Sequence, residues 1–308
     1  MPRPERIRVG TSGWHYPRGD DRWTGVFYPR GTKDELAYYA ERFDTVEVNV
    51  TFYRQVPPET TQAWAARTPD RFDFSVKLYQ KFTHPKMYEA ATGKPAAVVR
   101  DDLDAFKRSV SPLAEAGKLG SVLAQFPASF KRTPESERML DGLLTALADF
   151  PVTVELRHRS WSDAEEATEE LLLRHRAGWA QIDEPKFATS VRQPLAVRGG
   201  IGYFRFHGRN AEAWWKKDAG PERYHYLYSD DELDSFVDAI LGASDRAERV
   251  YVYFNNHFRG ASVANALMMK PKLGQPLRAA CEPTLVEHYP VLEGRVPLAG
   301  PKGQGRLL

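Results

Sequence analysis

Residues 45–53 read TVEVNVTFY, and they contain the pattern that decides the fold. Apolar and polar side chains alternate along them, with Val46 and Val48 on one face and Glu47 and Asn49 on the other. Successive side chains of a β-strand point to opposite faces, so this period of two predicts a strand. The apolar face of such a strand must pack against another layer, and the polar face then points the other way.

Seven further segments are rich in Val, Ile, Phe or Tyr and are bounded by Gly, Pro or charged residues: 6–14, 72–79, 120–127, 151–158, 178–184, 201–208 and 249–256. Helical stretches lie between them, with start signals at Thr32 with Glu35, Thr133 with Pro134, and Ser229 with Glu232. Strands that alternate with helices predict a parallel sheet, and eight strands close a barrel. We therefore predict an α/β fold, a single (β/α)₈ TIM-type barrel with long aromatic-rich loops at the C-terminal face of the strands. A doubly wound open sheet is the alternative, but no strand precedes a glycine-rich nucleotide-binding motif.

The composition is that of a globular chain, with 308 residues, 42% hydrophobic and 27% charged. A net charge of +2 argues against a strongly basic nucleic-acid-binding protein, and no apolar run approaches the length of a membrane span. A single cysteine and an N-terminus without an apolar signal segment favour a cytoplasmic location. We expect residues 1–282 to form the barrel and residues 283–308 to form a Pro/Gly-rich C-terminal arm rather than a separate domain.

The polar faces of the predicted strands carry charged side chains. If the apolar faces meet the helices, the polar faces point into the barrel. The C-terminal half of the lumen would then hold Glu47, Lys77, Glu155, Arg157, Asp183, Arg205 and His207. Burying such charges is costly unless they are paired, and barrel active sites are built at this end of the strands. The pattern predicts a functional site, with a structural ion network or a one-sided antiparallel sheet as the alternatives.

Two loops expected at the same face are rich in aromatic residues. Residues 12–30 include Trp14, Tyr16, Trp23, Phe27 and Tyr28, and residues 209–228 include Trp214, Trp215 and Tyr224. Such rings can stack on a sugar, a base or a substrate ring, or they can pack as a plug. We expect Trp14, which directly follows a strand, to contact the substrate. The second loop is expected to form either a lid or a surface for a partner.

Several short motifs are VGTSGW at 9–14, FYP at 27–29, YYAERFDTVEVNVTFY at 38–53, ELRHRSW at 155–161 and VYFNN at 252–256. Together they resemble the YecE-like family, also called domain of unknown function 72, over roughly residues 7–270. The resemblance implies a TIM-type barrel without an established activity. The positions that match the family motifs are Thr11, Ser12, Gly13, Trp14, Glu47, Asn49, Thr51, Phe52, Tyr53, Lys77, Glu155, Arg157, His158, Trp161, Asn255 and Asn256.

We expect an enzyme, namely a hydrolase, lyase or isomerase, that acts on a small anionic or sugar-like molecule. The candidate catalytic residues, which would serve as general acid, general base or proton shuttle, are Glu47, Glu155, Asp183 and His207. The candidate substrate-binding residues are Trp14, Asn49, Tyr53, Lys77, Gln125, Arg157, Arg205 and Asn255. No strand-end Ser or Cys has an evident partner, so acid–base chemistry is favoured over a nucleophilic mechanism.

No cofactor is favoured, but a divalent metal such as zinc, manganese or magnesium is one alternative. Glu155, Asp183 and His207 resemble the ligand layout of xylose-isomerase-like and endonuclease-IV-like barrels, which would imply a phosphodiesterase, an endonuclease or a sugar isomerase. Those barrels carry a further carboxylate on the eighth strand, where this chain has Asn255. Arg157 would also repel a cation at this place.

The other alternative is a barrel that binds a ligand or a nucleic acid and catalyses nothing. From Arg259 onward the chain has seven basic residues against three acidic ones, and basic residues with interleaved aromatics can follow a phosphate backbone. The nearly neutral chain makes a solvated basic face the simpler interpretation, so a small molecule is the favoured partner. His84 is expected on the surface.

Overall fold

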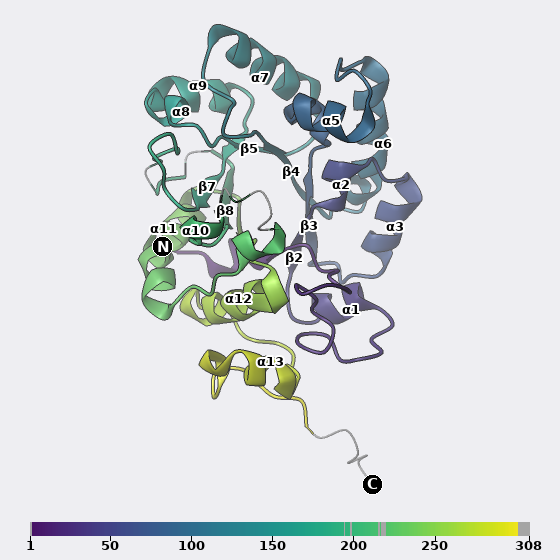
Figure 1. The fold of residues 1–308 in the computed structure, drawn as a ribbon, viewed down its shortest axis with the longest axis vertical. Coiled ribbons are helices and arrows are strands. Elements are labelled where there is room, and N and C mark those ends of the chain that lie inside the picture. The colour runs from purple at the N-terminus through teal and green to yellow at the C-terminus, as the bar shows by residue number, and fades with distance from the viewer. Residues whose placement is uncertain (1, 194, 198, 215, 217–219, 301–308) are drawn as a thin grey trace.

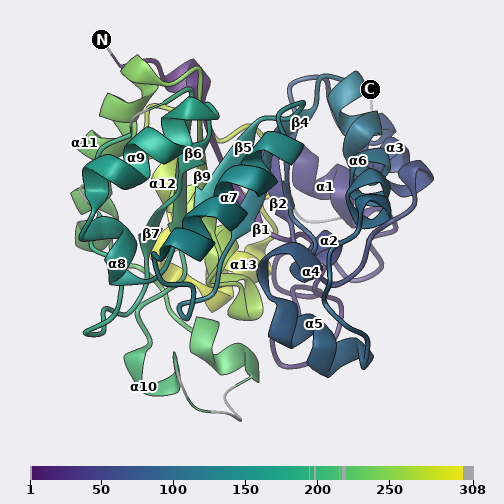
Figure 2. The ribbon, with the colours of Figure 1, turned by 90° about the horizontal axis from the view of Figure 1, so that it is seen from above.

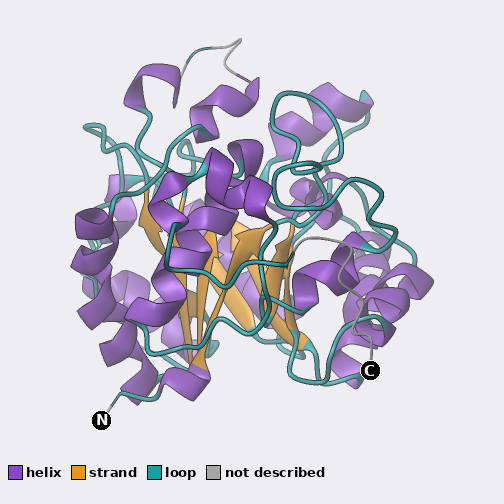
Figure 3. Cartoon of the chain, turned by 90° about the horizontal axis from the view of Figure 1, so that it is seen from below, coloured by secondary structure: helices purple, strands orange, loops and turns teal. Residues whose placement is uncertain are grey.

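A computed structural model describes residues 2–193, 195–197, 199–214, 216 and 220–300. Over this part of the chain nine parallel strands form one sheet, in the order β6-β5-β4-β3-β2-β1-β9-β8-β7. Their bounds are β1 Ile7–Ser12, β2 Thr45–Val48, β3 Asp73–Lys77, β4 Leu119–Gln125, β5 Val152–Glu155, β6 Gly178–Trp179, β7 Gln181–Asp183, β8 Ile201–Phe206 and β9 Arg249–Phe254. The strands lie in the middle of the molecule with helices around them (Figures 1 and 3). The predicted α/β barrel is confirmed.

The barrel closes through one short segment, residues 178–183. Its first half, β6, pairs with β5, and its second half, β7, pairs with β8. Between them Ala180 N donates to Val154 O at 2.9 Å. The predicted strand 178–184 is therefore two short strands, so the described chain has nine strands instead of eight. Because β6 and β7 are the two edges of the sheet, the barrel is nearly closed at this point.

Helices cover the outer face of the barrel (Figure 2). Their bounds are α1 Glu35–Ala40, α2 Val50–Tyr53, α3 Pro58–Ala66, α4 Gln80–Thr83, α5 Pro85–Thr92, α6 Arg100–Glu115, α7 Pro134–Ala146, α8 Arg159–Ser162, α9 Glu165–Arg174, α10 Ala211–Trp214, α11 Asp230–Arg246, α12 Ala261–Lys272 and α13 Pro283–His288. Among the described residues, none of these helices has the length and apolar character needed to cross a membrane.

Two of the predicted helix starts form as expected. Ser229 and Glu232 make a reciprocal capping box at α11, and the Thr133 side chain caps α7, which begins with a proline. The third start is shifted by two residues, because the side chain of Asp34 rather than Thr32 caps α1. A carboxylate oxygen at this position accepts a backbone N–H that has no partner within the helix.

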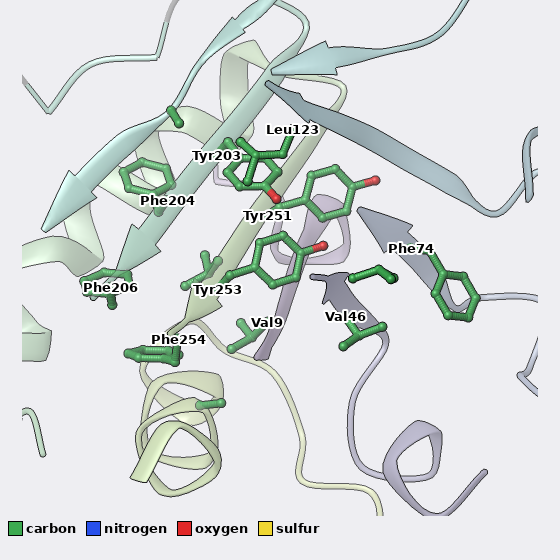
Figure 4. Close-up of a cluster of buried hydrophobic side chains, with 14 of the residues drawn as sticks. Val9, Val46, Phe74, Leu123, Tyr203, Phe204, Phe206, Tyr251, Tyr253 and Phe254 are labelled. Carbon is green, nitrogen blue, oxygen red and sulfur yellow. The ribbon is translucent and has the colours of Figure 1, made fainter. Parts of the chain in front are cut away.

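The alternation of side chains on β8 and β9 separates the apolar core from the lumen. Figure 4 shows Phe204, Phe206 and Phe254 on one side of these strands and Tyr203, Tyr251 and Tyr253 on the other. Phe206 packs against Phe236 of α11, with ring centroids 4.9 Å apart, so the phenylalanine side faces the helices. On the lumen side the Tyr253 hydroxyl donates to Ser75 Oγ of β3 at 2.9 Å. The polar faces point into the barrel, as the sequence pattern predicts.

The described part of the C-terminal arm, up to residue 300, packs against the barrel. Figure 1 shows α13 beside α12. Leu285 and Leu292 are fully buried, and the Thr284 hydroxyl donates to Val26 O at 3.0 Å. Residues 301–308 of the predicted arm lie outside the described residues, as does Trp215 of the second aromatic loop.

Candidate functional site

Arg205 of β8 lies inside the barrel between two carboxylates. Its Nε and Nη2 donate to Glu47 of β2 at 2.8 and 2.7 Å, and its Nη1 donates to Glu155 of β5. The side chain of Arg205 is 1% exposed and the two carboxylates are not exposed at all. The three residues form a row of paired charges across the lumen, which compensates the cost of burying each one.

Arg157 extends this row toward the open end of the barrel. Its Nε donates to Glu155 at 2.6 Å, and its Nη1 lies 3.3 Å from the Glu184 carboxylate. Burial alone would raise the pKa of Glu155, but the guanidinium groups of Arg205 and Arg157 hold it well below its usual value. Burial raises the pKa of Glu184, whose nearest cation is Arg157. Glu155 is therefore ionised and fully engaged with the two arginines.

His207 lies between the same two arginines and is neutral. Its Nε2 is 3.1 Å from Arg157 Nη2 and 3.3 Å from Arg205 Nη1, and its Nδ1 pairs with the Asn255 amide at 2.9 Å. Guanidinium groups can only donate, so Nε2 is the acceptor in these contacts. Burial and the two guanidinium groups lower the pKa of His207 to about 3. This arrangement makes His207 a support for the arginines rather than a proton donor.

A cavity of about 350 Å³ opens above this row, at the C-terminal face of the strands. Cationic side chains line it, those of Lys77, Arg157 and Arg205, whereas Glu47 and Glu155 do not. The amide side chains of Asn49, Gln125 and Asn255 also line it. The site therefore presents positive charge and amide groups to a ligand, and the carboxylates of Glu47 and Glu155 lie behind the arginines.

A second cavity, of about 280 Å³, adjoins the first. Both are lined by Gln125, Arg157 and Tyr224, so the two form one continuous cleft. Glu184 lines only the second cavity. The cleft is large enough for a small molecule, with one acidic side chain at the far side of Arg157.

Lys77, at the end of β3, differs from the other charged groups of the cleft. Its Nζ lies 4.1 Å from the centre of the Phe52 ring, and it has no hydrogen-bond or ion-pair partner among the described residues. Burial, with the Arg205 charge next, lowers the pKa of Lys77 to about 7, even though Glu47 and Glu155 favour its charged form. Near neutral pH a large fraction of this amine is therefore neutral, and its lone pair is available.

Aromatic rings form the wall of the cleft. Tyr16 stacks on His257 with ring centroids 4.7 Å apart, and Tyr224 packs at a tilt against the same imidazole with centroids 4.8 Å apart. Tyr53 is at the rim and is 66% exposed. The second aromatic loop thus reaches over the cleft through Tyr224, which is the position expected for a lid.

In the first aromatic loop some rings pack as a plug and another ring lines the cleft, so both interpretations of its sequence apply. Trp23, Phe27 and Tyr28 are fully buried and pack as a plug, whereas Tyr16 lines the cleft. Trp14 does not line the cleft. It packs edge-on against Trp64 of α3, with centroids 5.4 Å apart. The expected contact between Trp14 and substrate therefore lacks structural support.

The predicted strand 45–53 is a strand only up to Val48. Residues 50–53 form the helical turn α2, and Thr51 Oγ1 donates to Lys77 O at 2.7 Å. Asn49 still lines the cleft, because the turn starts directly after it. The alternating side-chain directions of the strand therefore end at Val48, although the sequence pattern continues, and α2 sets the direction of the Tyr53 side chain.

Asp183 lies on the face of the sheet that meets the helices, and the prediction that it points into the lumen was wrong. In β7 Asp183 pairs with Phe206, which faces the helices, while Ile182 pairs with Arg205, which faces the lumen. Asp183 accepts from Arg209 Nε and Nη2, both at 2.9 Å, and from the Tyr228 hydroxyl at 2.7 Å. Its carboxylate anchors the loop that follows β8 and does not reach the cleft.

The same correction removes the ligand set of the metal alternative. Glu155 faces the lumen and is bound by two arginines, while Asp183 faces the helices. In the part of the chain that the structure describes, no three His, Cys, Asp or Glu side chains gather closely enough to hold a metal ion. Glu155, Asp183 and His207 therefore do not converge.

Sequence reasoning missed several residues of the cleft, among them the titratable Glu184 and His84. Glu184 continues the lumen-facing alternation one residue after Asp183, and the small residues Gly178 and Ala180 on that face were the available signal. His84, expected on the surface, lines both cavities and is only 9% exposed. Burial and then the Lys77 charge lower the pKa of His84 to about 4.

Comparison with known proteins agrees with this fold and gives no activity. The family described as "Protein of unknown function DUF72" matches residues 8–288. The UPF0759 protein YunF of Bacillus subtilis is 31% identical over 272 residues, which cover 85% of this chain and 93% of YunF. A crystal structure of a DUF72 family protein from Enterococcus faecalis has a TM-score of 0.76 and 28% identity, covering 88% of this chain and 96% of that one. One from Thermotoga maritima has a TM-score of 0.74 and 35% identity, covering 87% and 99%.

Proposed function

The chain belongs to the DUF72 family of proteins of unknown function, and we propose that it is an enzyme that binds a small anionic molecule in the cleft and moves a proton with Lys77. One observation carries this proposal. The 350 Å³ cavity presents Lys77, Arg157 and Arg205, while Glu47 and Glu155, which neutralise the arginines from behind, do not line it. Glu184, the third carboxylate, lines only the second cavity. An anion can therefore approach the cations without meeting those carboxylates.

Arg157 is the residue best placed to bind the anion. Its side chain is 17% exposed, whereas that of Arg205 is 1% exposed. A guanidinium has five N–H donors. Nε of Arg157 donates to Glu155 and its Nη2 contacts His207, whereas its Nη1 makes only an ion pair with Glu184, whose Oε2 accepts no hydrogen bond from the described residues. At least two N–H groups therefore remain for a carboxylate or phosphate, which suits the fork geometry of arginine.

Lys77 is the residue best placed to transfer a proton. General acid–base catalysis is most efficient when the pKa of the group is near the working pH, and the pKa of Lys77 is lowered to about 7. Glu47 and Glu155, the acid–base candidates from sequence, then have the role of holding the arginines in place. Asn49, Gln125 and Asn255 supply amide groups for the hydroxyl or carbonyl groups of a sugar-like anion.

The proposal takes a small molecule as the partner, because the cleft is made of cavities of about 350 and 280 Å³ with Tyr224 lining both. It requires no cofactor and no nucleic acid. It keeps the cytoplasmic location expected from the single cysteine.

The experiment measures anion binding and the protection of Lys77 together. Inorganic phosphate and pyruvate are added to the full chain, and the thermal midpoint is recorded for the wild type, Arg157→Gln and Arg157→Lys. Arg159→Gln is the matched control, because Arg159 is two residues away in an exposed ion pair with Asp163. The same anions are then tested for slowing the acetylation of Lys77 by acetic anhydride, read by peptide mass spectrometry.

We expect at least one anion to raise the midpoint of the wild type and of Arg159→Gln, and to raise that of Arg157→Gln much less. The same anion should slow the acetylation of Lys77. If neither anion changes the midpoint or the labelling of Lys77, or if Arg157→Gln and Arg159→Gln respond alike, the proposal is wrong.

A further inference from the structure

The Lys77 amine has free space in front of it and no acceptor beside it. Lys77 lines the 350 Å³ cavity, and no described residue accepts a hydrogen bond from its Nζ. The carboxylates of the lumen are engaged elsewhere, with Glu47 bound by Arg205 and Glu155 by both Arg205 and Arg157. A lysine that only balanced charge would be expected to contact one of these carboxylates.

The surroundings of Lys77 match the ways in which proteins make a lysine nucleophilic. One is desolvation, and Lys77 is buried beside the Phe52 ring, which lies 4.1 Å from Nζ and also attracts the protonated form through a cation–π contact. The other is a neighbouring cation, here Arg205, whose own charge is fixed by two buried carboxylates. Both conditions favour an amine with a free lone pair at neutral pH.

The same cavity presents groups that would hold and polarise a carbonyl compound. Arg157 retains at least two N–H donors for an anionic substituent. Asn49, Gln125 and Asn255 bring side-chain amides to the cavity wall, and an amide N–H can bind a carbonyl or hydroxyl oxygen. One small molecule that carries both an anionic group and a carbonyl group would satisfy all of these contacts.

Resting on the proposed function, we infer that the substrate is an aldehyde or ketone bearing a carboxylate or phosphate, and that Lys77 Nζ forms an imine with its carbonyl carbon. The amine nitrogen bonds to the carbonyl carbon, and both amine protons leave with the carbonyl oxygen as water. The imine takes one proton from solution to become the iminium. An iminium accepts the electron pair of an adjacent C–C or C–H bond, so this step favours a lyase or an isomerase over a hydrolase.

The test is reductive trapping. The full chain is incubated at pH 7 with sodium cyanoborohydride and either pyruvate or glycolaldehyde phosphate, which separate the carboxylate from the phosphate. Pyruvamide serves as the uncharged counterpart of pyruvate. Intact mass and peptide mapping locate a secondary amine whose added mass is that of the carbonyl compound minus one oxygen. Lys77→Arg keeps the positive charge and cannot form the imine, and exposed Lys94 is the internal comparison.

We expect trapping at Lys77 with pyruvate, glycolaldehyde phosphate or both, on the order of a thousandfold faster than at Lys94. This ratio reflects the neutral fraction of an amine with a pKa of about 7 against that of an ordinary lysine. Pyruvamide should react far more slowly, and Lys77→Arg should show no adduct at position 77 while still binding the anion.

Two outcomes overturn the inference and are distinct from failure of the proposed function. If phosphate or pyruvate raises the thermal midpoint and protects Lys77 from acetylation, yet neither carbonyl compound is trapped, the site binds anions without forming an imine. Equal trapping of pyruvate and pyruvamide would also show that the anionic substituent is not recognised. If the anions neither bind nor protect Lys77, and nothing is trapped, the proposed function fails as well.

Discussion

Arg205 donates through Nε and Nη2 to the two carboxylate oxygens of Glu47, at 2.8 and 2.7 Å, across the lumen of the barrel. The Glu47 side chain is not exposed and the Arg205 side chain is 1% exposed. Removing one member of such a pair leaves the other buried and uncompensated. The stability of the protein around the buried side of the cleft therefore depends on this pair.

Glu47→Gln should destabilise the protein by about 3–5 kcal/mol, because the Arg205 charge would keep its burial and lose a bidentate partner. Urea unfolding of wild type and variant measures this change. Arg205→Met should also destabilise, and the double variant should cost less than the sum of the two. The control is Glu135→Gln, which removes an exposed pair with Arg138 and should leave the unfolding free energy nearly unchanged. Equal effects of Glu47→Gln and Glu135→Gln on the free energy of unfolding would contradict the stabilising role of the buried pair between Glu47 and Arg205.

Because of Lys77, the free energy of unfolding should rise with pH above pH 7. Its pKa is lowered to about 7 in the folded protein, so between pH 7 and about 10.4 the unfolded chain holds a proton that the folded chain has released. The unfolding free energy should therefore increase with pH in this window, by at most about 1.4 kcal/mol per pH unit from this group. Comparison of urea unfolding at pH 7 and pH 9 should show a smaller rise for Lys77→Met than for the wild type. Lys94→Met should behave as wild type, and a Lys77→Met variant with an undiminished rise would refute the shift.

His207 should stay neutral throughout the physiological range. Its pKa is lowered to about 3, below that of an unfolded histidine, so the unfolded chain takes up the proton first as the pH falls. The stability that His207 contributes is fully present above about pH 6.5 and is lost between about pH 6.5 and pH 3. In ¹⁵N-histidine NMR spectra, the signal that disappears in His207→Asn should not titrate between pH 5 and pH 8. A midpoint inside that interval would show that the ring is protonated more easily than its setting between Arg157 and Arg205 allows.

Asp183→Asn should loosen the loop after β8 instead of altering the cleft. The substitution weakens the bidentate contact with Arg209 and the hydrogen bond from Tyr228, at a cost of about 1–3 kcal/mol. Limited proteolysis should cut residues 209–228 faster in this variant. Asp163→Asn, which breaks the exposed pair with Arg159, is the control and should not change the rate. An unchanged cleavage rate together with weakened anion binding would place Asp183 in the site after all.

Gly178→Ala should weaken the closure of the barrel. A Cβ at this position would lie 2.9 Å from Ile201 O and 3.2 Å from Thr153 Oγ1, so the backbone of β6 or β8 would have to shift. Gly142→Ala is the matched control, because nothing lies within 4 Å of a Cβ there and the position is inside α7. Alanine in a helix interior stabilises by about 1 kcal/mol relative to glycine. The two thermal midpoints should move in opposite directions, and a rise for Gly178→Ala would mean that the β6 junction is not tightly packed.

The barrel and the direction of most lumen side chains could be predicted from the sequence, since alternation is a local property of each strand. The face predicted to point into the lumen was wrong for residues 178–184. Polar residues occur on both faces of this segment, so the alternation does not show which face packs against the helices. Gln181 and Asp183 are on one face and Glu184 is on the other. Only the pairing of Asp183 with Phe206 shows which face meets the helices.

The exact ends of the strands also could not be predicted from the alternation of apolar and polar residues. Residues 45–53 keep their alternation to the end, yet β2 stops at Val48 and the chain turns into α2. A strand extends only as far as its neighbours offer backbone partners, and β2 finds them in β1 up to Glu47 and in β3 up to Val48. That limit belongs to the assembled sheet and not to the segment.

The sequence by itself determined that charged side chains share one face of the strands, opposite the apolar face that packs against the helices, because side chains along a strand alternate with a period of two. Only the tertiary structure decided which charges are paired and which face a ligand. Glu47 and Arg205 are 158 residues apart in the chain, and their pairing depends on where β2 and β8 stand around the barrel. The same placement buries both glutamates behind the arginines and leaves Lys77 with an open cavity, because burial and distance exist only once the sheet has closed.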